Sequence, residues 1–248
     1  MCGLTGFVGA GDEGDLRAMT ATLFHRGPDG EGFYRDRHVP VFLGFRRLIV
    51  LDPDGGQQPM WDEDRTVGVV FNGEIYNHLS LRQELEALGH RFLSDHADGE
   101  VLVQGWKAWG RDLFKRLDGM FVLAVFDRNA STVTLARDRF GEKPLYYARG
   151  SNSIVFGSEL TALLKHPTLR HLSVSKTALQ KFFAYGFFPG PHTPYDGILK
   201  LLPGHVLNID AKTLNTEASS YWRFCLGNTD PPPGKAEDWA AELETLIA

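Results

Sequence analysis

The chain begins with Met1-Cys2-Gly3-Leu4-Thr5-Gly6-Phe7-Val8, a short apolar run interleaved with glycine. This composition predicts a strand that another backbone or a ligand approaches closely. Cys2 stands directly behind Met1, so cleavage of Met1 would place a thiol and a free α-amine on one residue. A thiol is a good nucleophile, and an N-terminal amine with a pKa of about 7.7–8.0 can serve as its base. The alternative is that position 2 has no role beyond following the start codon.

Strands and helices follow this run in a recognisable order. We expect strands at 41–51, 67–71, 120–127, 132–136, 146–147 and 154–156, with a hairpin turn at 128–131. Helices are expected at 80–89, 98–109, 159–164 and 176–185, the first opening with a capping box from Ser80 to Gln83. Because the strands come in sequential pairs with helices between them, the sequence predicts an α+β protein whose sheets are covered by helical layers.

The composition changes near the end of the sequence. Residues 227–234 include three consecutive prolines, which indicates a stiff linker. An amphipathic helix then begins, and its apolar face needs a surface to pack against. We therefore expect one domain over residues 1–210, a connecting segment over 211–235, and the start of a second, interrupted domain over 236–248.

Composition excludes several protein classes. The 248 residues are 43% hydrophobic and carry a net charge of -5, which argues against a nucleic-acid-binding protein. No apolar stretch is long enough for a membrane helix, and no secretory signal is visible. Cys2 and Cys225 lie at opposite ends of the chain, which fits neither a disulfide framework nor a zinc site. A cytoplasmic location is expected, with no metal site.

Two polar segments in the first fifth of the chain have both a structural and a functional interpretation. The turn His25-Arg26-Gly27-Pro28-Asp29-Gly30 is typical of an ordinary loop. In Arg46-Arg47-Leu48-Ile49-Val50-Leu51-Asp52, two arginines enter an apolar strand. A guanidinium there favours a carboxylate partner, which it can bind with two parallel hydrogen bonds. A strand at the edge of a sheet is the alternative.

Two further polar segments also have both a structural and a functional interpretation. Asn72-Gly73-Glu74-Ile75-Tyr76-Asn77 follows a buried strand, and Asn-Gly is a common hairpin turn. The Asn72 amide and the Gly73 N–H would equally form a compact pair of donors for an oxyanion. Asp98-Gly99-Glu100 stands at an expected helix start, where Asp98 is either an N-cap or a carboxylate that binds a ligand ammonium.

Together and in this order, these segments resemble the class II glutamine amidotransferases, which are N-terminal-nucleophile hydrolases. Later segments narrow the resemblance to the glutaminase half of glutamine-hydrolysing asparagine synthetases; they are Leu117–Phe121, Ala136–Tyr147 and Gly157–Leu160. Pro203–His205 and Tyr221–Trp222 also resemble the region where that family joins its two halves. The resemblance implies a four-layer αββα sandwich of two antiparallel sheets flanked by helices.

The resemblance also implies roles for individual residues. Cys2 would be the nucleophile and its own α-amine the base, while Asn72 and Gly73 would form the oxyanion hole. Arg47 would bind the α-carboxylate of glutamine, and Asp98 with Glu74 would bind its α-ammonium. The same pocket would be lined by backbone groups of Leu48, Ile49, Val50 and Leu51.

Other polar residues of the matching segments are expected to have supporting roles. Arg26 would buttress the site, and His25 would stabilise its turn. Arg137, Asp138 and Lys143 are expected to fix a loop and a domain contact rather than to take part in the chemistry.

In the resembled family, ammonia passes to a second domain that adenylates aspartate and needs ATP and Mg²⁺. The Ser-Gly-Gly-x-Asp-Ser phosphate cradle of that domain does not occur in these 248 residues, so no cofactor is expected in this chain. The expected partners are L-glutamine and a synthetase domain, in cis or in trans, and a homodimer is compatible with the sequence. Neither nucleic acid nor membrane is expected.

Two alternatives stay open. One is an amidotransferase with a different carboxylate acceptor, and the other is a catalytically silent binding module. The segments 48–51 and 97–100 depart mildly from the family pattern, since the first lacks a polar residue and the second has Ala97 where serine is common. Because of these departures, the sequence predicts the identity of the acceptor substrate less firmly than it predicts Cys2 as the nucleophile.

Overall fold

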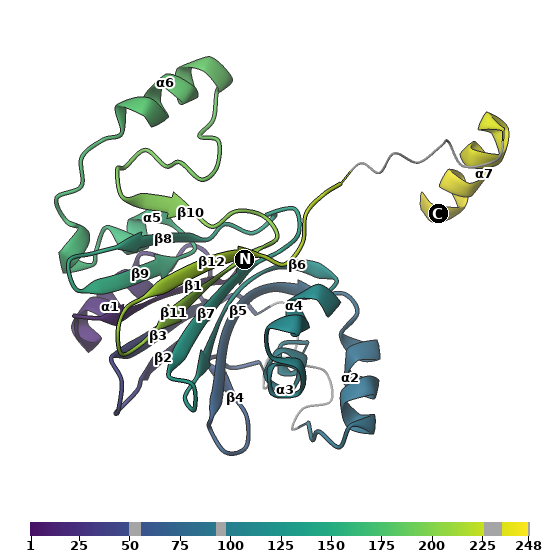
Figure 1. Ribbon diagram of the computed structural model, residues 1–248, viewed down its shortest axis with the longest axis horizontal. Coiled ribbons are helices and arrows are strands. Elements are labelled where there is room, and N and C mark those ends of the chain that lie inside the picture. Colours follow the sequence, from purple (N-terminus) through teal and green to yellow (C-terminus); the bar gives the residue numbers. More distant parts are fainter. Residues whose placement is uncertain (50–55, 93–97, 226–234, 248) are drawn as a thin grey trace.

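The computed structural model describes residues 1–49, 56–92, 98–225 and 235–247 (Figure 1). The described residues form two six-stranded antiparallel sheets. The first has the order β10-β8-β9-β1-β3-β2. Its strands are β1 Gly3–Gly9, β2 Gly30–Arg35, β3 Val41–Arg47, β8 Tyr146–Arg149, β9 Ser153–Gly157 and β10 Ile198–Lys200.

The second sheet has the order β12-β11-β7-β6-β5-β4. Its strands are β4 Met60–Trp61, β5 Val67–Ile75, β6 Gly119–Asp127, β7 Thr132–Arg137, β11 His205–Asp210 and β12 Thr216–Ser220. Two helices, α1 Glu13–Ala21 and α5 Leu160–Leu163, pack on the first sheet. On the second sheet lie α2 His78–Ala87, α3 Glu100–Trp109 and α4 Leu113–Arg116, together with the short 3₁₀ turn Gly110–Asp112 (Figure 1).

Three apolar layers separate these four layers of secondary structure. The layer between the sheets includes Leu43, Val70, Val122, Phe156 and Leu207. A second apolar layer joins the second sheet to α2, α3 and α4, and a third joins the first sheet to α1 and α5. Each sheet is therefore buried on both faces. The predicted four-layer αββα sandwich is confirmed.

Strand β5 shows how this layering places polar groups. Val69 and Phe71 belong to the apolar layer under the helices, whereas Val70 belongs to the layer between the sheets. Successive side chains point to opposite faces of a strand, so Asn72 points into the space between the sheets. β5 contacts β1 and β3 across that space. The alternation thus brings Asn72 towards the strands that carry Cys2 and Arg47.

Several local predictions are confirmed. The helix at 176–185 is α6, Lys176–Tyr185, and the hairpin at 128–131 joins β6 to β7. Gly89 has a positive φ of 89° directly after α2, as expected for the glycine that ends a helix. The remaining helix is α7, Ala236–Ile247, and Pro167–Leu169 forms another 3₁₀ turn.

Three local interpretations are wrong. Ser80 does not begin α2; Asn77 is the N-cap residue, and the Ser80 hydroxyl donates to the Asn77 carbonyl at 2.9 Å. Asn72-Gly73 is not a hairpin turn, because β5 continues through both residues to Ile75. Asp98 is not an N-cap either, since α3 starts at Glu100 with Gly99 before it. In each case tertiary pairing overrides a local preference.

The elements not predicted from the sequence are α1, α4, β2, β4 and β10–β12. β2 reads Gly30-Glu31-Gly32-Phe33-Tyr34-Arg35, with two glycines and mostly half-exposed side chains, so its strand pattern is weak. Gly32 is required there because a Cβ would lie 1.7 Å from the Gln58 carbonyl oxygen. No helix in the described part of the chain has the length and apolarity needed to cross a membrane.

Candidate active site

Strand pairing fixes the position of Cys2. Gly3 of β1 pairs with Arg46 of β3 in an antiparallel ladder, so Cys2, one residue earlier, lies beside Arg47 and Leu48. The Leu48 N–H donates to the Cys2 thiol, with 3.3 Å between nitrogen and sulfur. Leu4 is anchored on the other side, because its N–H donates to the Ser158 hydroxyl at 3.0 Å. The thiol is thus held at the end of a strand buried on both faces.

The turn at 25–30 braces this strand end. Arg26 Nε donates to the Cys2 carbonyl at 2.9 Å, and Arg26 Nη1 pairs with Glu159 at 3.0 Å. Gly27 packs on the end of β3 so closely that a Cβ would lie 2.6 Å from backbone atoms of Arg46 and Arg47. His25 Nε2 also contacts Glu159 at 2.9 Å. The predicted roles of Arg26 as a buttress and of His25 in its turn agree with these contacts.

The facing sheet supplies two hydrogen-bond donors. Asn72 is buried, and its Nδ2 has no hydrogen-bond partner among the described residues. Phe71 N–H donates to the Gln58 side chain at 2.5 Å, and Ile75 N–H donates to Asp98 at 3.1 Å. N–H groups two residues apart point to the same edge of a strand, so the Gly73 N–H points to this edge, between those two. Asn72 and Gly73 both line the cavity that Cys2 lines.

Two carboxylates lie at the same end of β5. Burial raises the pKa of Asp98, while the Ile75 N–H and the positive charge of His78 act in the opposite direction. Burial also raises the pKa of Glu74, and the neighbouring Asp98 raises it further. Two carboxylates whose pKa values are raised by burial, one of them further raised by its neighbour, are well suited to a cationic ligand group, which would favour their ionised forms.

Arg47 and Leu48 line the cavity, but the rest of their predicted segment does not join them there. Ile49 lies on a smaller adjoining pocket of about 150 Å³, where its N–H donates to Asp29 at 2.8 Å. Val50 and Leu51 lie outside the described residues. The Arg47 guanidinium is close to Gly56, where a Cβ would lie 3.0 Å from Arg47 Nη2.

The cavity has a volume of about 360 Å³. The predicted site residues that line it are Cys2, Arg47, Leu48, Asn72, Gly73, Glu74 and Asp98. The other lining residues are Met1, Phe45, Gly56, Gln58, Met60, Phe71, His78, Met120 and Lys143. A thiol, two hydrogen-bond donors, a guanidinium and two carboxylates therefore converge on one space, although they come from segments up to about 100 residues apart in the sequence.

A family model described as a glutamine amidotransferase domain matches residues 1–222. The chain belongs to this family. It is 35% identical to asparagine synthetase [glutamine-hydrolyzing] 3 of Bacillus subtilis, over 100% of this chain and 40% of that protein. It is 37% identical to asparagine synthetase [glutamine-hydrolyzing] 1 of the same organism, over 84% of this chain and 33% of that protein. The chain thus spans less than half the length of these relatives.

A solved structure shares the fold of this glutamine amidotransferase domain. Glutamine phosphoribosylpyrophosphate amidotransferase of B. subtilis superposes with a TM-score of 0.63 over 89% of this chain and 49% of that protein, at 17% sequence identity. The architecture of two antiparallel sheets with flanking helices is therefore shared across very different sequences.

Three polar residues of the domain's cavity were not predicted to lie there: Gln58, His78 and Lys143. His78 follows the predicted donor segment by one residue and starts α2, and its Nδ1 lies 2.8 Å from the Ile75 carbonyl oxygen. Because His78 directly follows the predicted donor segment 72–77, the sequence could have indicated that it lies near the site. Gln58 lies outside the predicted segments, and Lys143 is far from every predicted site residue in the sequence, so only the fold could reveal them.

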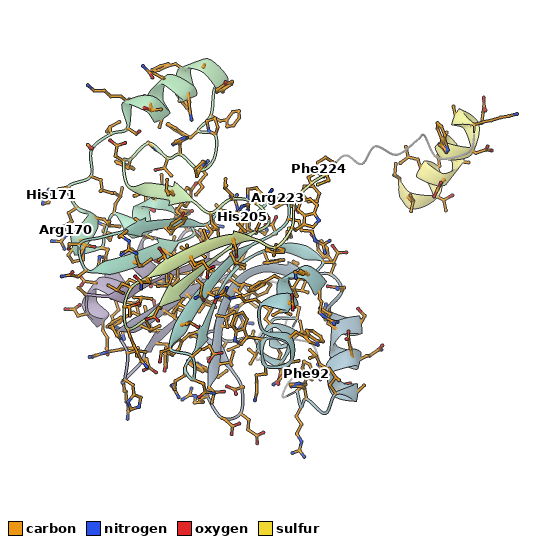
Figure 2. The ribbon with its side chains drawn as sticks, in the orientation of Figure 1. Phe92, Arg170, His171, His205, Arg223 and Phe224 are labelled. Atoms are coloured by element: carbon orange, nitrogen blue, oxygen red, sulfur yellow. The ribbon has the colours of Figure 1, made fainter. Side chains whose placement is uncertain are left out.

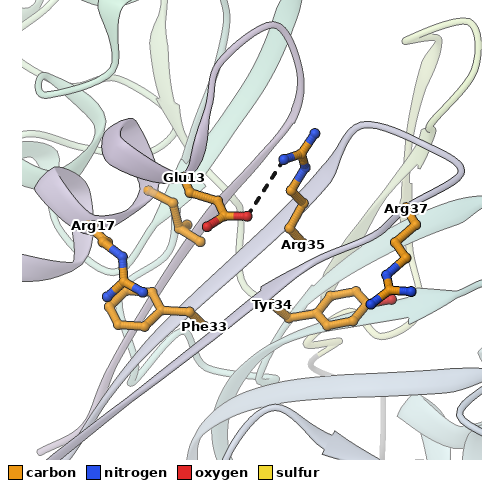
Figure 3. Close-up of a pocket in the computed structure, with 7 residues that line it drawn as sticks. Glu13, Arg17, Phe33, Tyr34, Arg35 and Arg37 are labelled. Atoms are coloured by element: carbon orange, nitrogen blue, oxygen red, sulfur yellow. Dashed lines mark ion pairs between the residues drawn. The ribbon is translucent and has the colours of Figure 1, made fainter.

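A second cavity of about 550 Å³ lies between α1 and β2. We call it the arginine pocket, and it is lined by Glu13, Leu16, Arg17, Phe33, Tyr34, Arg35 and Arg37 (Figure 3). The Arg17 guanidinium stacks 4.3 Å from the centre of the Phe33 ring, and Arg35 lies 3.6 Å from Glu13. Among the described residues, the arginine pocket is lined by no cysteine and by one carboxylate, that of Glu13.

An exposed aromatic surface lies where the chain leaves the second sheet. We call it the aromatic patch; it consists of Phe140, Trp222 and Phe224, whose rings contact one another at centroid distances of 5.1–6.4 Å. Phe140 and Phe224 are 64% and 65% exposed. Arg139, His205 and Arg223 surround it, and Figure 2 shows His205, Arg223 and Phe224 at this exit. An exposed apolar surface of this kind favours a protein contact.

Proposed function

We propose that this domain hydrolyses glutamine to glutamate and ammonia through a thioester on Cys2. The observation that carries the proposal is the shared cavity of the Cys2 thiol and the buried Asn72 Nδ2, which has no partner among the described residues. A buried donor without a partner is costly to a folded protein, by about 1–3 kcal/mol. An oxyanion formed next to the thiol would satisfy it.

Removal of Met1 would expose the α-amine of Cys2, which accepts the thiol proton as sulfur attacks the side-chain amide carbon of glutamine. The oxygen of that amide becomes negatively charged and accepts hydrogen bonds from Asn72 Nδ2 and the Gly73 N–H. The amine then returns the proton to the leaving nitrogen, the carbon–nitrogen bond breaks, and ammonia departs. Water attacks the resulting γ-glutamyl thioester, which releases glutamate and restores the thiol.

The remaining residues of the cavity would select and orient glutamine. Arg47 would hold its α-carboxylate with charge-assisted hydrogen bonds. Asp98 and Glu74 would hold its α-ammonium, and the Leu48 backbone would keep the sulfur in place, as its 3.3 Å contact already does. Both ends of an amino acid are thereby recognised, so the reactive amide is placed by two separate charge pairs.

We further propose that the ammonia serves an ATP-dependent amidation of aspartate in a synthetase domain, present in cis or in trans. The support is the similarity to asparagine synthetases, which are more than twice as long as the matched region. The aromatic patch and the exposed apolar side chains of α7, among them Leu243, Leu246 and Ile247, would provide contact surface. ATP and Mg²⁺ would be bound by that domain.

The nucleophile is tested by mass spectrometry and by labelling. We expect the purified protein to begin at Cys2, to release glutamate from glutamine, and to bind one equivalent of 6-diazo-5-oxo-L-norleucine, a glutamine analogue that alkylates thiols. Cys2→Ala should abolish both activities, whereas Cys225→Ser at the exposed second thiol should change neither. Retention of Met1 in active protein, or labelling that survives Cys2→Ala, would contradict the mechanism.

A further inference from the structure

The loop after β7 holds the backbone of Lys143 in a fixed place. The Asp138 carboxylate accepts hydrogen bonds from the N–H groups of Phe140, Glu142 and Lys143 at 2.9–3.1 Å. From the other side, Arg137 Nε donates to the Lys143 carbonyl at 2.7 Å. The predicted role of Arg137 and Asp138 in fixing a loop agrees with these contacts. Their consequence is that the backbone of Lys143, and with it the direction of its Cα–Cβ bond, is fixed.

That side chain runs into the Cys2 cavity rather than to solvent. Lys143 is only 7% exposed and lines the cavity together with Cys2. Its Nζ lies 3.6 Å from the Met1 sulfur and forms no ion pair within the part of the chain that the structure describes. A thioether is a weak acceptor, and a buried ammonium is costly unless it has an anionic partner. The cavity therefore contains a cation whose present contact is lost when Met1 is removed.

Several other charged or titratable groups face the same space. Cys2 precedes β1, Arg47 ends β3 and Glu74 lies in β5. His78 starts α2, and Asp98 lies just before α3. Arg26 reaches the Cys2 carbonyl from the turn after α1. The charge of Lys143 acts across the cavity, since it lowers the pKa of Glu74 against the effects of burial and of Asp98.

We propose that Lys143 is a positioning residue whose ammonium keeps the α-amine of processed Cys2 neutral and favours its thiolate. The inference rests on the proposed function. Cleavage of the Met1–Cys2 bond creates the new amine and removes the thioether that Nζ contacts. A further positive charge close to the Lys143 ammonium is disfavoured, and a thiolate is favoured. A unit charge at about 8 Å shifts a neighbouring pKa by about one unit at an effective dielectric constant of about 20–40.

Alkylation of Cys2 by iodoacetamide across pH 5–10 tests this role. Iodoacetamide has neither an ammonium nor a carboxylate, so its rate does not depend on how Asp98 and Glu74 bind glutamine. All proteins carry Cys225→Ser, so that a single thiol reacts. The variants are Lys143→Met, Lys143→Gln and Lys143→Arg, and the matched control is Lys165→Met, which removes the same charge from an exposed position.

We expect Lys143→Met and Lys143→Gln to move the midpoint of the rate profile about one unit to higher pH, and to slow alkylation at pH 7 by about 5–10-fold. Lys143→Arg should restore the wild-type midpoint, and Lys165→Met should leave it unchanged. The acidic limb of kcat/KM for glutamine should move in parallel with the alkylation profile.

An unchanged midpoint in the two neutral variants overturns the proposal, as does an equal shift in Lys165→Met or failure of Lys143→Arg to restore it. A purely structural lysine would lower the melting temperature without moving the midpoint, so thermal unfolding is recorded for each variant. If Lys143→Met does not fold, Lys143→Gln carries the comparison. Wild-type protein without glutamine hydrolysis would contradict the proposed function, whereas active wild-type protein with an unshifted Lys143→Met contradicts only the role of Lys143.

Discussion

The Cys2 cavity and the arginine pocket lie at opposite ends of the same pair of strands. Gly30 of β2 pairs with Arg47 of β3 at the end near Cys2, and Arg35 pairs with Phe42 near the arginine pocket. The arginine pocket is larger, at about 550 Å³ against about 360 Å³. Its ion pair between Arg35 and Glu13 is exposed on both sides, at 58% and 59%. Neither size nor charge therefore distinguishes the candidate active site.

The two cavities differ in the burial of their polar groups and in whether those groups have hydrogen-bond partners. Around Cys2, a buried amide donor has no partner among the described residues, and two carboxylates are partly desolvated. Around Arg17, the guanidinium is exposed to water, which satisfies its donors without any ligand. A buried donor without a partner, close to carboxylates with raised pKa values, indicates an active site better than the volume of a cavity does.

The largest effect should come from the oxyanion donor. Asn72→Ala should lower kcat for glutamine hydrolysis by about 10²–10³-fold, because one of two donors to the developing charge is removed. KM should change much less, since the donor acts mainly in the transition state. Arg17→Ala in the arginine pocket is the control and should leave both constants at wild-type values. Steady-state glutamate release measures them, and a loss confined to KM would refute the assignment of Asn72.

The next effect should appear in substrate binding. Asp98→Asn should raise KM for glutamine by about 10–100-fold, because a charge-assisted contact to the ammonium is lost. In the wild type, KM should rise as the pH falls through the raised pKa values of Asp98 and Glu74, and so at higher pH than for an ordinary carboxyl near about 4. In the variant this rise should be smaller. Equal pH profiles for the two proteins would argue against an ammonium contact.

Ionised Asp98 should also lower the stability of the folded protein, because its carboxylate is buried. Its pKa in the folded state is raised by burial, so its ionised form is disfavoured by folding, and stability is lost as the pH rises through that pKa. Asp98→Asn removes this cost and can still accept from the Ile75 N–H, so its melting temperature at pH 7 should exceed that of the wild type. Calorimetry at pH 5 and pH 8 provides the comparison, and a lower melting temperature at both pH values would count against it.

A smaller effect concerns the turn that braces Cys2. Gly27→Ala should lower the free energy of unfolding by about 1–3 kcal/mol, since the added Cβ overlaps the backbone of β3. Gly30→Ala is the matched control: its nearest heavy atom is 3.6 Å away in Arg47, an ordinary contact, and its effect should stay within about 0.5 kcal/mol. Urea unfolding of both variants measures the difference, and similar losses would show that the close packing of Gly27 is unimportant.

The smallest effect is expected in the arginine pocket. Glu13→Gln should change the free energy of unfolding by less than about 0.5 kcal/mol, because its pair with Arg35 is exposed and is separated by 3.6 Å. Glutamine hydrolysis should be unaffected. Urea unfolding and the glutamate assay decide this together; a clear loss of activity would mean that the two cavities are coupled.

The sequence allowed prediction of what depends on neighbouring residues. The hairpin at 128–131, the helix α6 and the donor pair Asn72-Gly73 each have a pattern within one short segment of the sequence. Lys143 and Gln58 could not be assigned to the site, because their approach to Cys2 depends on which strands pair and in what register. For the same reason, Asn72-Gly73 could be read as a turn: its local preference is the same in a hairpin and in a long strand.

The alternation along β5 has a consequence for how the domain can fail. Val70 and Asn72 share one face, while Phe71 and Ile75 share the other, so shifting the strand by one residue would bury the amide among the helices and expose apolar side chains to the polar cavity. The burial of apolar side chains that stabilises the core therefore also specifies the register of β5 that places the Asn72 amide in the cavity. A chain with this error of register would therefore lose burial of its core, and a stable fold with a misplaced amide is disfavoured.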